Sequence, residues 1–350
     1  MESSIDELAR LTTTAGGSVV GRLIQKIEVP SMSHYLGKGK LEELIALKST
    51  VDYNTVIFDD ELSPLQQRNL EEALQVKVID RAALILDIFA RRARTHEGKL
   101  QVELAQSQYL LPRLAGQWSH LERLGGGIGT RGPGESQLEP DRRLISRKIQ
   151  RLNGQIEEVR KHRARYRQQR SRSGIPVIAL VGYTNSGKST LLNALCRADV
   201  FTEDKLFATL DPTTRRLLLP DKTPVLFTDT VGFIRKLPPA IIRAFRATLE
   251  ELSEASLLLH VVDLSAPDAP EQCQTVEDAL AKLDLAGKPQ MTALNKIDRL
   301  LEPDRDWDET SALKYLADRS TDANTVLISA TRQWGLAELL ARVGQRLAKR

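Results

Sequence analysis

Residues 182–190 (GYTNSGKST) carry the clearest chemistry in this sequence, because they match the phosphate-binding pattern GxxxxGK[ST]. In such a loop, backbone amides and the amino end of the following helix bind phosphate oxygens. Lys188 then contacts the β- and γ-phosphates, and the Ser189 hydroxyl binds Mg²⁺. An apolar stretch over 175–181 precedes the loop and another over 190–195 follows it, which suits a strand and a helix. The sequence therefore predicts a nucleoside triphosphate site.

A second segment predicts contacts to the metal and to the γ-phosphate. The apolar run 225–229 is typical of a strand and ends in Asp229, which is followed by Thr-Val-Gly. The Asp229 carboxylate can hold Mg²⁺ through water, and the amide of Gly232 can contact the γ-phosphate. Between the loop and this strand, the segment 207–214 (FATLDPTT) offers threonines for one further metal-ligand position. Spacing alone does not choose among Thr209, Thr213 and Thr214, and we expect the segment to order with the γ-phosphate.

Two later segments predict which base is bound. The apolar run 290–294 leads into Asn-Lys-Ile-Asp, ending at Asp298. A carboxylate there can accept hydrogen bonds from N1–H and N2–H₂ of guanine, and adenine offers no such donor pair. The run 329–331 (SAT) follows a strand predicted over 326–328 and would close over the base with backbone amides. The site is therefore predicted to take GTP rather than ATP.

The residue after Asp-Thr-Val-Gly is informative because it cannot do the expected chemistry. Phe233 stands where Ras-type GTPases carry the glutamine that orients the attacking water. We therefore expect slow hydrolysis by the protein alone and a dependence on another group. A side-chain oxygen of Asn185 could bind a monovalent cation such as K⁺ beside the phosphates, or it could simply stabilise the loop; a partner that completes the site is the other candidate.

The elements that must position these residues form three predicted regions, giving an α/β fold in which a P-loop GTPase domain follows two smaller parts. Region 1–92 is predicted to be a small α/β subdomain with a parallel sheet, and region 173–350 the P-loop GTPase domain. The first has strands at 18–29, 54–58 and 76–79, and helices that begin near Lys38 and at Ser63-Pro64. The GTPase domain adds a strand at 257–263 and a last helix at 336–347.

Region 93–172 changes to a 3.5-residue apolar period. The spacing of 4, 3, 4 and 3 recurs in two series, Leu100, Leu104, Ser107, Leu111, Leu114 and Ile145, Ile149, Leu152, Ile156, Val159. This predicts an antiparallel coiled-coil hairpin, with two amphipathic helices on a globular core as the alternative. Pro112 is expected to kink or end the first helix. The glycine-rich tip loop 125–134 is predicted either to bind RNA or to act as a flexible turn.

Charge and composition limit the class of protein. Lys and Arg total 50 against 46 Asp and Glu, but the window 121–173 alone holds 14 basic and 6 acidic residues. The stretch 160–172, predicted to be a basic linker, has seven basic residues and no acid, which favours phosphate contacts over a merely solvated surface. Two distant cysteines, a polar N-terminus and the absence of a long apolar run predict a soluble, cytoplasmic protein without disulfides, zinc or a membrane span.

Taken together, the motifs resemble those of the HflX family, ribosome-associated GTPases of the Obg–HflX branch of the TRAFAC class. The resemblance rests on the GTPase motifs, on the glycine-loop signature at 126–143 and on 80–114, and it covers nearly the whole chain from about Gly17. Ser136 departs mildly from the family's usual threonine. Many members carry a further domain after the GTPase core, whereas this chain stops at Arg350, so either a shorter member or a truncated chain is expected.

The resemblance implies that Thr209 is the Mg²⁺-linked switch residue, so that Lys188, Thr209 and Gly232 act in catalysis and Ser189, Thr209 and Asp229 bind the metal. It also implies binding of a monomer to the large ribosomal subunit, ribosome-stimulated GTP hydrolysis, and splitting or rescue of stalled ribosomes under stress, with the hairpin, glycine loop and basic linker on rRNA. An rRNA-binding assembly or regulatory module, with GTP as a conformational ligand, is the alternative. The predicted nucleotide-binding residues are Gly182, Tyr183, Thr184, Asn185, Ser186, Gly187, Lys188, Ser189, Thr190, Phe207, Ala208, Thr209, Leu210, Asp211, Asp229, Thr230, Val231, Gly232, Asn295, Lys296, Ile297, Asp298, Ser329, Ala330 and Thr331.

Overall fold

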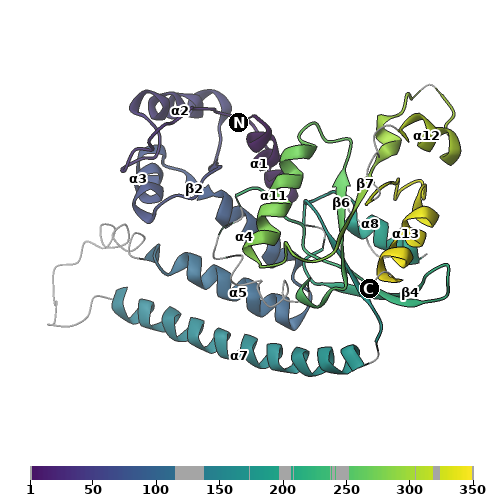
Figure 1. Cartoon of the computed structure of the whole chain (residues 1–350). Helices are drawn as coiled ribbons and strands as arrows, with labels where there is room; N and C mark the ends of the chain where they lie inside the picture. Colours follow the sequence, from purple (N-terminus) through teal and green to yellow (C-terminus); the bar gives the residue numbers. More distant parts are fainter. Residues whose placement is uncertain are drawn as a thin grey trace, which may run out of the picture. The chain divides into compact units, whose positions relative to one another are not determined.

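The computed structural model of the chain contains two compact units, each described here by itself (Figure 1). The first comprises Met1–Arg91, His96–Val159 and Pro238–Ala244, and the second comprises Arg92–Thr95, Arg160–Leu237 and Phe245–Arg350. The structure describes residues 2–114, 138–172, 174–196, 206–207, 209–236, 238, 241, 252–303, 305–317 and 324–348, with the backbone alone at 138–139 and 164–172. The predicted glycine-rich loop 125–134 and Ala208 lie outside the described residues.

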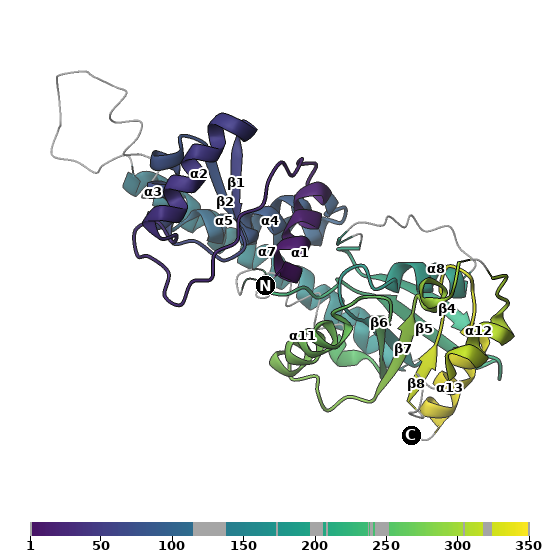
Figure 2. The ribbon, with the colours of Figure 1, turned by 90° about the horizontal axis from the view of Figure 1, so that it is seen from above.

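The first unit begins as the predicted small α/β part. Its two strands are parallel, and they pair from Thr55 with Lys77 through Phe58 with Asp80. Leu70, Leu74 and Val78 are fully or almost fully buried in the apolar cluster that joins the helices to this sheet. The elements, in chain order, are α1 (Glu2–Thr14), α2 (Lys38–Val51), β1 (Thr55–Phe58), α3 (Pro64–Leu74), β2 (Lys77–Asp80) and α4 (Arg81–Arg92), as Figure 2 shows from above.

Helix α3 begins where the sequence predicts it to begin. The backbone N–H of Gln66 donates to Ser63 Oγ (3.2 Å), and the Ser63 N–H donates to Gln66 Oε1 (2.9 Å). This reciprocal capping box satisfies two amides that the first helical turn leaves without intrahelical partners, and Pro64 needs none. Local side-chain chemistry therefore explains this boundary.

The strand predicted over 18–29 does not form, so that prediction was wrong. Residues 18–27 are extended but take part in no sheet, and the paired strands of this unit are β1 and β2. Leu23 packs against the apolar cluster, whereas Val20 and Val29 are exposed to 56% and 84%. A run rich in β-branched residues favours extended backbone, but a strand also requires a neighbouring backbone with which to pair.

Two helices form the predicted hairpin arms, α5 (His96–Leu110) and α7 (Leu138–Arg172), which lie side by side in Figure 1. Leu100, Leu104 and Leu152 are buried between them, packed against Ile149, Ile156 and Val159. Lys148 Nζ also contacts Glu103 Oε1 at 2.8 Å. The apolar spacing thus identified the seam. Its first arm is shorter than predicted, because α5 ends two residues before Pro112 and leaves Leu111 and Leu114 beyond it.

The basic stretch 160–172 was predicted to be a fraying helix end followed by a basic linker, and in the structure all of it is helical. Helix α7 continues without interruption to Arg172. The stretch contains neither glycine nor proline, and its arginines and glutamines are good helix formers. The helix stops before Gly174, whose φ of 65° lies in the left-handed region, and Pro176 follows. The positive charge is therefore carried on a helix.

The second unit is built on a six-stranded sheet in the order β4-β5-β3-β6-β7-β8, in which β4 alone is antiparallel to its neighbour. The sequence did not predict β4, which contains Thr213 and Thr214. The elements are β3 (Val177–Val181), α8 (Lys188–Cys196), β4 (Thr213–Leu218), β5 (Pro224–Asp229), β6 (Leu257–Asp263), α11 (Ala269–Lys282), β7 (Gln290–Asn295), the 3₁₀ helix η1 (Ile297–Leu300), α12 (Glu309–Tyr315), β8 (Thr325–Leu327) and α13 (Leu336–Ala348).

Helices cover both faces of this sheet (Figure 2). Leu191 of α8 and Leu339 of α13 share an apolar cluster with Phe227 and Leu259 on one face. Helix α11 lies on the opposite side of the sheet in Figure 2, and its Val276 and Leu280 are buried. Parallel strands covered in this way present their carboxyl ends at one edge, where ligands bind in open α/β sheets.

No helix in the part of the chain that the structure describes is long and apolar enough to cross a membrane.

We expect Leu152→Ala to destabilise the first unit by about 2 to 5 kcal/mol, because it empties a fully buried position between α5 and α7. Urea unfolding followed by circular dichroism measures this loss. Leu144→Ala, on the same helix but 64% exposed, is the matched control and should change stability by less than about 0.5 kcal/mol. Equal effects of the two substitutions would contradict the assigned seam.

Candidate nucleotide-binding site

The phosphate-binding loop connects β3 to α8 and can close only because it contains glycine at two positions. Gly182 has a φ of 151°, and a Cβ there would lie 2.3 Å from the carbonyl oxygen of Val261. Gly187 has a φ of 95°, and a Cβ there would lie 2.2 Å from Asn295 Nδ2. Both backbones approach their neighbours more closely than any side chain allows. The loop is thereby held against β6 and against the base-recognition motif.

Lys188 points back into this loop and is 6% exposed. Its Nζ donates to the carbonyl oxygens of Gly182 (3.1 Å) and Tyr183 (2.7 Å). Burial lowers the pKa of Lys188 to about 8, although the nearby Asp229 carboxylate acts in the opposite direction. A buried ammonium group with only carbonyls as acceptors is poised for a phosphate anion.

Three side-chain oxygens meet beside it in an arrangement that suits a hard cation. Ser189 Oγ donates to Asp229 Oδ2 (2.6 Å) and lies 2.7 Å from Thr209 Oγ1. Asp229 is 2% exposed, and its second oxygen, Oδ1, has no hydrogen-bond partner among the described residues. Burial, the largest effect, raises the pKa of Asp229, against the opposing effects of Lys188 and the hydroxyl hydrogen bonds. These residues could hold Mg²⁺, which binds few protein oxygens together with substrate phosphates.

Of the three candidate threonines, Thr209 is the one whose hydroxyl lies beside Ser189, at 2.7 Å from its Oγ. Thr213 and Thr214 begin β4, and the Thr214 hydroxyl lies 2.9 Å from Thr228 Oγ1 in the neighbouring strand. On either side of Thr209, Phe207 and Leu210 are 2% and 3% exposed and anchor the segment. The described part of the chain has no group of three or more His, Cys, Asp or Glu that could form a metal cage.

The base-recognition motif after β7 is joined to the phosphate loop by side chains. Asn295 Nδ2 donates to the carbonyl oxygen of Ser186 (2.9 Å), and Asn295 Oδ1 accepts from the N–H of Ala330 (3.0 Å). Lys296 Nζ donates to the carbonyl oxygen of Asn185 (2.8 Å) and to Asp263 Oδ2 (2.6 Å). One asparagine and one lysine thus connect three loops at the carboxyl edge of the sheet.

Asp298, the predicted guanine ligand, lies beside the loop that follows β8 and contains Ser329 and Ala330. Ser329 Oγ donates to Asp298 Oδ1 at 2.6 Å, which orients the carboxylate. Ile297 and Ala330 are buried, whereas Thr331 is exposed. The run 329–331 therefore lies where it can flank a base held by Asp298, as the sequence predicts, but through two of its three residues.

The segment after Asp229 is held against the phosphate loop by its backbone. Phe233 N–H donates to the carbonyl oxygen of Gly182 (3.1 Å), and Thr184 N–H donates to that of Phe233 (2.7 Å). A Cβ on Gly232 would lie 2.8 Å from Thr184 Cα, so this closeness also requires glycine. The Phe233 side chain is 4% exposed. Its buried ring has no polar group, so it cannot orient water as a glutamine amide would.

Several contacts at this edge were not predicted. Tyr183 Oη accepts from the Arg235 N–H (3.0 Å), and Asp211 accepts from residues that precede α5. Asp263 was predicted only as the end of a strand, although its position at a carboxyl edge signals a functional carboxylate. Thr230, which donates to the Leu180 carbonyl oxygen at 2.6 Å, acts within the sheet. Val231 and Thr190 are half-buried.

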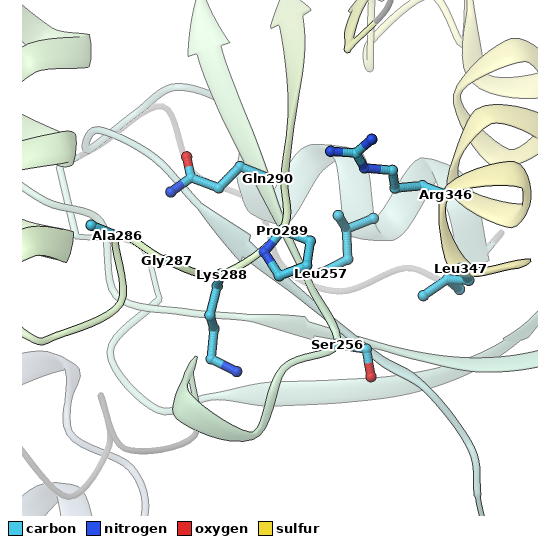
Figure 3. A pocket seen from close by; sticks show the side chains of 9 residues that line it. All are labelled: Ser256, Leu257, Ala286, Gly287, Lys288, Pro289, Gln290, Arg346 and Leu347. Carbon is cyan, nitrogen blue, oxygen red and sulfur yellow. The ribbon is translucent and has the colours of Figure 1, made fainter. Parts of the chain in front are cut away.

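A pocket of about 580 Å³ lies elsewhere in this unit. Its lining comes from the amino ends of β6 and β7 and from the end of α13, including Ser256, Gln290 and Arg346 (Figure 3). The phosphate and base motifs follow the carboxyl ends of the same strands. The pocket is therefore at the opposite edge of the sheet from the candidate site.

Comparisons with known proteins agree with this geometry. The chain is 50% identical over 349 residues to GTPase HflX of Caldanaerobacter subterraneus subsp. tengcongensis, covering 99% of this chain and 78% of that protein. GTPase HflX of Escherichia coli strain K12 is 43% identical over 346 residues, covering 98% and 79%. The chain belongs to the HflX family of GTPases. Family models described as GTP-binding GTPase N-terminal, GTP-binding GTPase Middle Region and 50S ribosome-binding GTPase match residues 2–90, 92–170 and 177–296.

A solved structure resembles this chain over almost its whole length. The crystal structure of SsGBP in complex with GDP is 26% identical, with a TM-score of 0.52, and covers 99% of this chain and 96% of that one. The HflX relatives and the P-loop domain identify the reaction of this family as GTP hydrolysis. They do not assign the individual residues, so the roles given above to the site side chains stay predictions.

One buried histidine behind the phosphate loop yields a stability prediction. His260 on β6 is 5% exposed and pairs with Val181 of β3. Burial, aided by the charge of Lys188, lowers the pKa of His260 to about 4 from 6.5. Between pH 6.5 and 4 the unfolded chain therefore binds a proton at His260 that the folded chain does not bind. The stability of the fold decreases as the pH is lowered through this window.

We expect the free energy of unfolding to fall by about 2 kcal/mol when the pH is lowered from 7 to 5, because His260 binds a proton in the unfolded chain. His260→Asn, which cannot titrate, should show a correspondingly smaller loss over the same range. Urea unfolding of both proteins at the two pH values gives this difference directly. Identical pH dependence of the two proteins would show that His260 does not carry a lowered pKa.

Proposed function

We propose that this GTPase binds guanine nucleotide with Mg²⁺, binds the large ribosomal subunit and splits or rescues stalled ribosomes in the cytoplasm. The observation that carries the proposal is the joining of the phosphate loop, Asp229 and Asn295–Asp298 at one sheet edge, in a chain that also carries a basic helical arm. A family model described as a 50S ribosome-binding GTPase matches residues 177–296, which supports the choice of partner.

The chain's own groups account for nucleotide binding in this proposal. Amides of 182–190 and the amino end of α8 bind the phosphates, and the Lys188 ammonium neutralises charge on the β- and γ-phosphates. Asp298, oriented by Ser329, accepts hydrogen bonds from guanine. Asn295 and Lys296 keep the base and phosphate subsites at a fixed separation through the carbonyl oxygens of Ser186 and Asn185.

The metal position fits Mg²⁺ because of the orphaned Oδ1 of Asp229 and the two neighbouring hydroxyls. Ser189, Thr209 and Asp229 would hold the ion. When bound, the ion neutralises the charge that develops on the phosphate oxygens during transfer to water. The Gly232 amide, kept close to Lys188 by the contact between Phe233 and Gly182, is available to the γ-phosphate.

Slow hydrolysis by the protein alone follows from the buried Phe233. The Phe233 ring has no group that can hydrogen-bond the attacking water at the position where Ras-type GTPases carry glutamine, so the ribosome is proposed to complete the site. GTP then stabilises the ribosome-binding conformation, and hydrolysis releases it. In this proposal the bound nucleotide controls whether the protein binds the ribosome, and the ribosome controls when hydrolysis releases the protein.

The proposed RNA contact is the helical arm. Arg143, Arg147 and Arg151 are exposed on α7 at a spacing of four residues and therefore lie along one face. The basic stretch 160–172 continues the same helix. Such a row of cations matches the regular spacing of phosphates, and it predicts affinity that falls steeply with salt.

Sucrose-gradient sedimentation of 70S ribosomes with this chain and GTPγS tests the proposal. We expect the 70S peak to fall, free subunits to rise and the chain to travel with the large subunit; GDP should have little effect. An intact 70S peak at saturating chain would eliminate splitting. Binding to precursor particles without splitting would favour the assembly or regulatory module instead.

Base selection can be tested on the isolated chain with Asp298→Asn. GTP affinity should fall about tenfold or more, because charged hydrogen bonds to N1–H and N2–H₂ are lost. XTP affinity should rise, since the amide can donate to the second carbonyl of xanthine. Titration with fluorescent nucleotides measures both, and the exposed Asp306→Asn is the control. Unchanged GTP affinity in Asp298→Asn would contradict the assigned role.

A further inference from the structure

The segment that carries Thr209 has a second attachment through Asp211, which was predicted to bind nucleotide but whose carboxylate contacts Arg94 and Thr95 in the structure. The Asp211 carboxylate accepts the backbone N–H groups of Arg94 (2.9 Å) and Thr95 (2.9 Å) and the hydroxyl of Thr95. Arg92–Thr95 belongs to the second compact unit, together with the nucleotide site. Residues more than a hundred positions apart are therefore joined two residues from the predicted metal ligand.

This contact joins one carboxylate to three donors within the second unit. Asp211 accepts two backbone amides, those of Arg94 and Thr95, and the Thr95 hydroxyl. Three donors on one carboxylate define its position more narrowly than a single hydrogen bond would.

The same contact restricts Thr209. Leu210, which stands between Thr209 and Asp211 in the sequence, has a buried side chain, and so does Phe207 two residues before Thr209. With Asp211 held by Arg94 and Thr95, the chain has little freedom at Thr209, whose hydroxyl lies 2.7 Å from Ser189 Oγ. Release of Asp211 would leave Leu210 and the start of β4, where Thr213 pairs with Asp229, to hold the chain on that side.

We propose that the Arg94–Thr95 turn is a positioning element for Mg²⁺-dependent GTP binding, and that its contact with Asp211 is coupled to the nucleotide state. Thr95 acts through Asp211, which in turn fixes Thr209 where the metal is predicted to bind. The inference rests on the proposed function for that metal position, but it requires no ribosome. By linkage, a ligand that favours ordered Thr209 also favours the contact of Asp211 with Arg94 and Thr95, and the reverse holds equally.

The test compares nucleotide affinities of Thr95→Val and Thr95→Ser. Thr95→Val removes the hydroxyl bond and should weaken GTPγS binding in Mg²⁺ about threefold, whereas Thr95→Ser keeps the bond and should bind like the unmodified chain. Asp211→Ala removes all three acceptor contacts and should weaken it about tenfold or more. GDP affinity in EDTA should be unchanged for Thr95→Val, because it does not involve the switch segment.

Thr275→Val, whose hydroxyl bonds within α11, is the matched control. A second readout is hydrogen exchange at the amides of Arg94 and Thr95, which should be slower with GTPγS and Mg²⁺ than with GDP, and equal in both states for Asp211→Ala. Equal GTPγS affinity in all variants overturns the positioning role. Exchange that does not depend on the nucleotide in the unmodified chain overturns the coupling.

These outcomes separate the inference from the proposed function. If the unmodified chain binds GTPγS no better with Mg²⁺ than with EDTA, the predicted metal site itself is wrong. If it shows the Mg²⁺ effect but the variants retain it, only the positioning role fails. Ribosome splitting enters neither measurement.

Discussion

The burial of Lys188 and Asp229 is the constraint on which the rest of the nucleotide site depends. Both side chains are almost fully buried. Burial lowers the pKa of Lys188 and raises the pKa of Asp229, so in each case it favours the neutral form. Ionisable groups are buried where a partner compensates the cost of removing them from water. The carbonyl oxygens of the loop and two hydroxyls supply part of that compensation here. A nucleotide phosphate beside Lys188 and a cation beside Asp229 would supply the remainder, so empty and loaded sites should differ strongly in stability.

Close backbone packing makes that burial achievable. The loop can surround Lys188 because Gly182 and Gly187 leave no Cβ against Val261 and Asn295. The same closeness lets Asn295 and Lys296 bind loop carbonyls directly, so the base subsite moves with the phosphate subsite. The segment around Thr209 has fewer attachments, namely two buried apolar side chains and the contact of Asp211 with Arg94 and Thr95. The site therefore has a fixed half and a half whose position can depend on the γ-phosphate.

Much of this site could be predicted from the sequence, because its motifs combine local patterns with fixed spacing. The strand, loop and helix around Lys188 follow one another in the chain. The strands that end in Asp229 and Asn295 likewise lead directly into the motifs that begin at those residues. Contacts such as that of Asp211 with Thr95 join distant segments and leave no periodic signal. The antiparallel β4 and the unpaired segment 18–29 depend on which backbone lies nearby, which propensity does not encode. Spacing left Thr209, Thr213 and Thr214 open; the family resemblance pointed to Thr209, which in the structure lies beside Ser189.

Thermal unfolding of the chain with and without nucleotide tests the central claim, that the buried charges await phosphate and cation. With GTPγS and Mg²⁺ at about a thousand times the dissociation constant, the midpoint of the nucleotide-binding unit should rise by about 5 °C or more. Guanosine, which lacks phosphates, should raise it far less, and ATP should leave it unchanged. Equal stabilisation by guanosine and by GTPγS with Mg²⁺ would contradict the account, because Lys188 and Asp229 would then have gained nothing from the groups proposed to neutralise them.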